Sequence, residues 1–289
     1  MKLNMKLPVL LALAGVIQAA PAKTQDSFTI CSAKFVTPLT EKWVAEYSKI
    51  NPRMQIKIVD GTESGADVKI SVFGKEENSD AQTVARYAVL PVAGKNSSLI
   101  PDLKKKKLNG KRLKELYFEK NILDDDYQPE KESKHRATVY AGSSRQSCCL
   151  AFAGCFGFNP KDLKGKRIAG DDIFLNSAVA KDSSGVSFNF LNYVFDLRSR
   201  QLKEEIAILP LDLKKEYSEI LDGSNLDRML ELLEKKKIDL IPVEELRFET
   251  TDADNTEIRK FLQWVRTEGQ IFNHQFGLLK VEDRNLAQR

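Results

Sequence analysis

The stretch Cys31-Ser32-Ala33-Lys34-Phe35-Val36-Thr37-Pro38 joins an apolar, strand-like run at 28–31 to a helical pattern at 40–50. A second stretch, Ala141-Gly142-Ser143-Ser144-Arg145-Gln146-Ser147-Cys148-Cys149, has the same design, with a helix expected to start near Ser147. Each consists of a strand, a short polar turn and a helix. Such units are typical of an α/β fold, in which helices cover the faces of a sheet.

Both turns lead into the N-terminus of a helix, where unpaired amide N–H groups and the helix dipole attract anions. Each turn has hydroxyl groups and one cation, Lys34 in the first and Arg145 in the second. Arginine can bind an oxyanion through two parallel hydrogen bonds. Either turn alone is typical of an ordinary helix cap, because Ser and Thr are common capping residues. Two turns with one cation each favour a shared anion site.

The remaining segments continue the alternation of strand-like and helix-like patterns. Strands are expected at 54–59, 67–73, 85–92, 137–140, 188–196, 206–211 and 238–243. Helices are expected at 108–118, 213–220, 226–236 and 256–268, and the pattern at 170–180 is mixed. We find no internal repeat, so the alternation predicts one α/β body or two lobes.

Residues 1–22 have the pattern of a cleavable secretory signal. Lys2 and Lys6 precede an apolar run at 7–17, and Ala20-Pro21-Ala22 offers small residues for cleavage after Ala22. The run is shorter than the roughly 20 residues that span a bilayer, and a polar segment follows at once, which disfavours a retained anchor. No cysteine stands at the cleavage site, so no lipid anchor is expected. We predict an exported, periplasmic protein.

Composition argues against several other classes of function. Cleavage removes Lys2 and Lys6 and lowers the net charge from +4 to +2, which leaves no overall basic field for nucleic acid. The basic run 104–107 is typical of a solvated helix. With only His135 and His274 in the chain, no metal site is expected, and no cofactor motif is present.

The four cysteines are Cys31, Cys148, Cys149 and Cys155. Export permits disulfides, but four cysteines allow three pairings, and the sequence does not choose among them. On one helix, Cys148 and Cys155 would lie about 10 Å apart along the axis, too far for a bond. We interpret the cysteines as small, buried packing residues.

Four segments together resemble a known family. Lys34-Phe35-Val36-Thr37-Pro38-Leu39-Thr40-Glu41-Lys42-Trp43 is similar to the Thr-Phe-Pro-x-Pro-x-x-x-x-Trp entry helix of phosphate-type periplasmic solute-binding proteins of ABC transporters. Residues 84–92 resemble that family's crossover strand, and 261–270 resemble its C-terminal helix. Residues 144–152 stand where the family has its Arg-x-Asp-Gly-Ser-Gly-Thr anion loop. The resemblance covers nearly all of the chain after residue 22.

The resemblance implies a type II periplasmic binding protein fold, in which a hinge closes two lobes around a ligand cleft. One lobe would comprise 23–88 plus 208–289, and the other 89–207. The implied ligand is a small inorganic oxyanion, with phosphate as first choice, and the implied partner of this monomer is an ABC-transporter permease. The residues implied to contact the ligand are Lys34, Phe35 and Ser64 from one lobe and Arg145, Ser147 and Cys148 from the other.

Two acids of the family pattern are absent here. Val72 stands at one of these positions, and the 144–147 loop contains no acid. Protonated phosphate carries an O–H donor that needs an acceptor, and leaving it unpaired costs about 1–3 kcal/mol. Sulfate, another oxyanion or a carboxylate therefore stay open as ligands. Asp182 is either a substitute acceptor or the cap of a turn.

Two further hypotheses come from other classes. An enzyme would use Cys148 or Ser147 as nucleophile with His135 as base, but we find no nucleophile elbow and no motif of paired carboxylates, so we expect no catalysis. Alternatively, the binding-protein fold serves as an interaction module without transport, which the absent acids favour.

Overall fold

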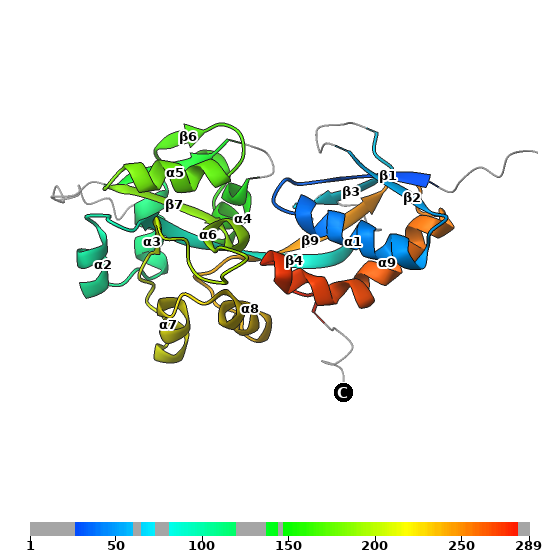
Figure 1. Cartoon of the computed structure of the whole chain (residues 1–289). Coiled ribbons are helices and arrows are strands. Elements are labelled where there is room, and N and C mark those ends of the chain that lie inside the picture. Colours follow the sequence, from blue (N-terminus) through cyan, green and yellow to red (C-terminus); the bar gives the residue numbers. More distant parts are fainter. Residues whose placement is uncertain (1–26, 60–64, 73–80, 120–136, 144–146, 283–289) are drawn as a thin grey trace, which may run out of the picture.

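The computed structural model describes residues 27–59, 65–72, 81–119, 137–143 and 147–282. Two α/β halves lie side by side, and strands β4 (Gln82–Gly94) and β9 (Val243–Thr250) run between them (Figure 1). The strands are hydrogen-bonded in the order β2-β1-β3-β9-β4-β7-β5-β6, with β8 also on β4. The chain is therefore α/β, as its alternating pattern predicts.

The first half, called lobe one here, is built on β1 (Ser27–Ser32), β2 (Gln55–Val59) and β3 (Val68–Ser71), together with β9 and the start of β4. Strand β1 pairs in parallel with both β2 and β3. Helices α1 (Thr37–Ile50), α9 (Thr256–Arg266) and η2 (Glu268–Phe276) pack against one another beside this sheet. Buried Trp43 of α1 donates from Nε1 to the Gly269 carbonyl at 2.9 Å, which fixes η2 to α1.

The second half, called lobe two, contains the end of β4 with β5 (Thr138–Gly142), β6 (Lys166–Ile168), β7 (Gly185–Phe190) and β8 (Ile206–Ile208). Its core is aromatic, since the rings of Phe152 and Phe188 stack at 4.0 Å. The elements around this core are α2 (Ile100–Lys105), α3 (Gly110–Tyr117), α4 (Cys148–Cys155), η1 (Pro160–Asp162), α5 (Ile173–Lys181), α6 (Leu191–Val194), α7 (Lys215–Asp222) and α8 (Leu226–Lys235).

The lobe boundaries predicted from the sequence, 23–88 plus 208–289 against 89–207, stay a prediction. Helices α7 and α8, which follow residue 208, lie beside the elements of lobe two in Figure 1. Backbone bridges hold this segment there, because Leu211 pairs with Leu108 and Asn225 pairs with Gln201. The chain reaches the lobe-one sheet again along β9.

The structure departs from the predicted elements in several places. The strand expected at 238–243 is instead β9 at Val243–Thr250, where Leu246 and Phe248 are buried at strand spacing between charged neighbours. The strand expected at 188–196 ends at Phe190, and the chain continues as α6. The mixed 170–180 segment forms α5. Short apolar runs are ambiguous between strand and helix, and packing decides between them.

No helix in the described part of the chain has both the length and the apolar character needed to cross a bilayer. Of the cysteines, Cys31, Cys148 and Cys149 are buried, as interpreted from the sequence. Cys155 differs, since it is exposed at the C-terminal end of α4, where its thiol lies 3.5 Å from the Asp239 carbonyl.

Candidate functional site

The first predicted turn lies in lobe one, between β1 and α1. The Val36 amide donates to the Ala33 carbonyl at 2.8 Å, and the Thr37 amide approaches the same oxygen at 3.1 Å. This turn ends at α1 without a side-chain cap. The Lys34 side chain is exposed, and the amides of Lys34 and Phe35 donate to no residue that the structure describes. The sequence predicts these groups as anion donors of lobe one, and that role stays a prediction.

Phe35 connects the two lobes directly. Its ring is buried and stacks on Phe190 of lobe two at 3.8 Å, with the planes 8° apart. The edge of Tyr87, from β4, packs against both rings. The Phe35 carbonyl accepts a hydrogen bond from Asn192 Nδ2 at 2.7 Å. The predicted residue Phe35 thus lies at the meeting place of the lobes, and its ring and carbonyl already have partners there.

The second predicted turn leads into α4 in lobe two. Ser147 is the N-cap, and its Oγ accepts from the Cys149 amide at 3.3 Å. The Ser147 hydroxyl donates to Asp172 Oδ1 at 2.8 Å, and the Cys148 amide donates to Asp172 Oδ2 at 2.6 Å. Ser147 and Cys148, the two predicted ligand contacts of lobe two that the structure describes, therefore both bind a carboxylate. This carboxylate belongs to the chain itself.

Asp172 is held in place by its surroundings. It precedes α5 and is 5% exposed, and its carbonyl accepts from buried Asn189 at 2.7 Å. Gly142, at the end of β5, lies directly under the Ser147–Asp172 contact. A Cβ at Gly142 would overlap both Asp172 Oδ1 and Ser147 Oγ. The arrangement therefore depends on glycine at this position.

Burial raises the pKa of Asp172, while hydrogen bonds from Cys148 and Ser147 act in the opposite direction. Burial also raises the pKa of the Cys148 thiol well above its ordinary value, which disfavours the nucleophilic thiolate. His274, of lobe one, contacts Glu234 of α8 at 2.8 Å rather than either proposed nucleophile. His135 lies outside the described residues. The hydrolase arrangement considered above needs His135, so the described residues do not test it.

The other residues singled out in the sequence as site candidates or as departures from the family pattern differ in where the structure places them. Ser64 and Arg145 lie outside the described residues. Asp182 caps a turn, accepting from the Ser184 amide at 2.9 Å and hydroxyl at 2.8 Å, at the opposite end of α5 from Asp172. Val72 is buried, and its carbonyl lies 3.4 Å from the Tyr87 hydroxyl. In the described chain, no three His, Cys, Asp or Glu side chains gather as a metal site.

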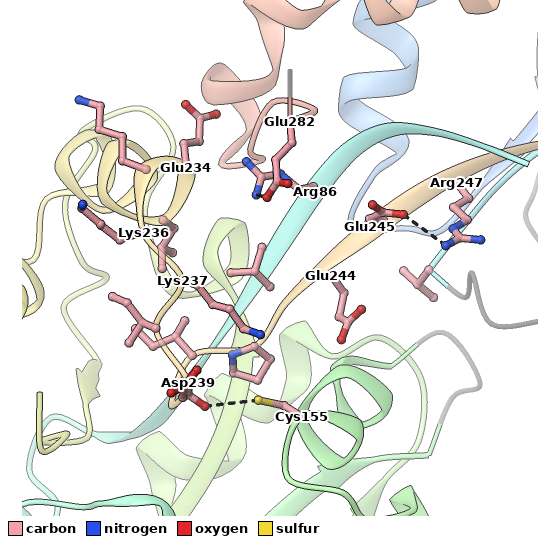
Figure 2. Close-up of a pocket in the computed structure, with 17 residues that line it drawn as sticks. Arg86, Cys155, Glu234, Lys236, Lys237, Asp239, Glu244, Glu245, Arg247 and Glu282 are labelled. Carbon is pink, nitrogen blue, oxygen red and sulfur yellow. Dashed lines mark hydrogen bonds and ion pairs between the residues drawn. The ribbon is translucent and has the colours of Figure 1, made fainter. Parts of the chain in front are cut away.

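A cavity of about 780 Å³ lies beside the connecting strands β4 and β9, bordered by α8 and by the C-terminal end of α4. Figure 2 shows the side chains that line it. Its walls carry charges of both signs. Arg86 pairs with Glu282 at 2.7 Å, and Arg247 pairs with Glu245 at 3.3 Å. None of the predicted ligand residues is among the described residues that line it. This cavity is therefore separate from the two helix N-termini.

The fold is similar to that of solved binding proteins. An ABC-type phosphate transport receptor from Vibrio cholerae matches with a TM-score of 0.59 and 11% identity, covering 89% of this chain and 100% of that chain. A protein assigned as a phosphate ABC transporter substrate-binding protein, with bound phosphate, from Clostridium perfringens matches with a TM-score of 0.57 and 15% identity, with the same coverage. The chain has the fold of the two-lobed periplasmic binding proteins. The fold expected from the sequence is confirmed.

The same fold occurs outside transport receptors. The regulatory domain of MetR, a LysR family regulator from N. meningitidis, matches with a TM-score of 0.51 and 13% identity, covering 89% of this chain and 99% of that chain. No protein-family model matches the chain. No curated protein matches it either. At these identities the likeness establishes the fold, and function has to be argued from the site.

Sequence reasoning missed Asp172, Asn192 and Phe190. Asp172 stands 25 residues after Ser147, in a segment with no clear period. Its only local signal is its place before a helix, where an Asp is common. Asn192 lies 157 residues from its acceptor on Phe35, a separation at which no local pattern can predict a contact.

Proposed function

We propose that this protein is an exported binding protein that captures a small oxyanion between its lobes. One observation carries the proposal: the N-terminus of α4 holds a carboxylate through the Ser147 hydroxyl and the Cys148 amide. These donors bind an oxyanion in the manner expected of a helix N-terminus. The Lys34 turn, at the N-terminus of α1, supplies the opposing donors.

Phosphate is the first ligand to test. The family resemblance of the Lys34–Trp43 segment supports it, as do solved proteins of the same fold that are described as phosphate receptors. The leader pattern in residues 1–22 supports export to the periplasm. Delivery to an ABC-transporter permease follows from the same resemblance, with the receptor acting as a monomer.

Titration calorimetry on the chain lacking residues 1–22 tests this function with phosphate, sulfate and acetate. We expect phosphate to bind at micromolar concentration. Lys34→Ala and Arg145→Ala should each weaken binding by about 10- to 100-fold, because a hydrogen bond to a charged group contributes about 1.5–3 kcal/mol. Lys161→Ala, in η1 of lobe two, removes the same charge away from both turns and should bind like the wild type. An absence of binding by every anion would contradict the proposal.

A second candidate function is an interaction module without transport. The specific observation in its favour is the contact between lobes, where the Phe35 and Phe190 rings stack and Asn192 binds the Phe35 carbonyl. These contacts join the two lobes directly. Small-angle X-ray scattering separates the candidates, since a receptor changes its radius of gyration when phosphate is added, whereas a permanently closed module does not.

A further inference from the structure

The N-terminus of α4 has a limited set of donors for a ligand. Ser147 has one O–H donor, and Cys148 has one amide N–H. Both are directed at Asp172, at 2.8 and 2.6 Å, and the Ser147 oxygen also accepts from the Cys149 amide. When an external anion approaches the N-terminus of α4, the Ser147 hydroxyl and the Cys148 amide are therefore already bound to a carboxylate.

The Asp172 carboxylate also matches an oxyanion in chemistry. Its two oxygens divide the two donors between them, as two oxygens of a phosphate or sulfate would. The contact is part of a wider buried network, because Asn189 donates to the Asp172 carbonyl at 2.7 Å and to Asn176 Oδ1 at 3.0 Å. Gly142 leaves the space that the carboxylate and the Ser147 hydroxyl occupy. Asp172 is thus held against the helix by the fold.

We propose that Asp172 is an intramolecular competitor that sets how tightly lobe two binds an external oxyanion. This inference rests on the proposed function, because it concerns the same two donors. For an anion to reach them, the Asp172 carboxylate has to move away from Ser147 and Cys148. Breaking those two contacts costs free energy, and this cost weakens the binding of the external anion.

The opposite role for Asp172 is acceptor of a proton carried by the ligand. That role would make up for the acids missing at Val72 and in the 144–147 loop. The geometry favours competition, since each carboxylate oxygen already accepts one of the two α4 donors that an external anion would need. The two roles predict opposite effects when the carboxylate is removed.

The test compares wild type, Asp172→Asn and Asp172→Ala by titration calorimetry with phosphate and with sulfate at one pH and one salt concentration. Asparagine keeps the shape of the side chain and removes its charge, and alanine also releases both donors. We expect Asp172→Ala to bind both anions on the order of tenfold more tightly than wild type, with Asp172→Asn between them. Asp182→Asn removes an equal charge at the other end of α5 and should match wild type.

The outcomes separate the inference from the function on which it rests. Equal affinities in wild type and variants overturn the competitor role and leave anion binding in place. Weaker phosphate binding by the variants also overturns it, and assigns Asp172 as the acceptor of a ligand proton. If no protein binds either anion at millimolar concentration, the proposed function fails together with the inference. Thermal unfolding of each variant checks that it is folded, and Asp172→Asn carries the test if the alanine variant is not.

Discussion

Asp172 and Ser147 are 25 residues apart in the chain, yet their side chains form a 2.8 Å hydrogen bond in the core of lobe two. A carboxylate in such a place loses the solvation of its charged form, so burial raises its pKa. The helix N-terminus opposes this by stabilising negative charge. At the scale of single residues, the balance of these two effects determines how firmly the α4 donors are occupied.

The raised pKa of Asp172 predicts a particular dependence of stability on pH. Below about pH 3.9, the usual value for an unfolded chain, the group is protonated in both states and carries no penalty. As pH rises above that value, the unfolded chain loses the proton before the folded protein does. The free energy of unfolding therefore falls, by about 1.4 kcal/mol for each unit by which the folded pKa exceeds the unfolded one.

Urea unfolding of wild type and Asp172→Asn between pH 3 and pH 7 measures this effect. Because other acids titrate in both proteins, the informative quantity is the difference between the two curves. We expect wild type to lose stability relative to Asp172→Asn as pH rises. A difference that is constant across the range, or that changes in the opposite direction, would contradict the raised pKa.

At the scale of elements, the ends of β5, α4 and α5 meet around one glycine. Gly142 ends β5, Ser147 caps α4 and Asp172 precedes α5. The sequence predicted a strand, a polar turn and a helix here, because hydrophobic period and capping residues are local signals. It did not predict the approach of α5, since that approach depends on how α5 packs against β5 and β7 in space.

Gly142→Ala tests this junction. The added Cβ overlaps Asp172 Oδ1 and Ser147 Oγ, so the contact between α4 and α5 has to open. We expect a loss of about 1–3 kcal/mol in the free energy of unfolding, as for other overpacked sites, measured by urea denaturation. Gly154→Ala is the matched control, because a Cβ there meets nothing within 4 Å and alanine favours helix. An equal effect of the two substitutions would show that the junction is not tightly packed.

At the scale of the whole molecule, several contacts besides the connecting strands join the lobes. Asn192 binds the Phe35 carbonyl, Arg200 binds the His274 carbonyl at 2.8 Å, and Glu234 of α8 binds His274. Burial acts to raise the pKa of Glu234, but hydrogen bonds from His274 and the Lys280 amide outweigh it and lower that pKa. The described lobes are therefore in direct contact with each other.

Asn192→Ala tests how much of this contact between the lobes depends on one hydrogen bond. Removing the amide leaves the Phe35 carbonyl without its partner at the meeting place of the lobes. An unpaired buried acceptor costs about 1–3 kcal/mol, enough to favour an open arrangement in which water reaches it. We expect a larger radius of gyration by small-angle scattering. Asn159→Ala, at an exposed position of lobe two, should leave the radius of gyration unchanged. An unchanged value for Asn192→Ala would show that the other contacts between the lobes suffice.

The amino-acid sequence by itself determined the α/β class, most of the strands and helices, and the two turns that lead into helix N-termini. These follow from hydrophobic period, capping residues and turn chemistry, which act within a few residues. Tertiary structure alone decided what the N-terminus of α4 binds and what faces Phe35. The physical reason is that Asp172, Phe190 and Asn192 reach these groups only when separate elements pack together. A contact between distant elements produces no local pattern in the sequence that could predict it.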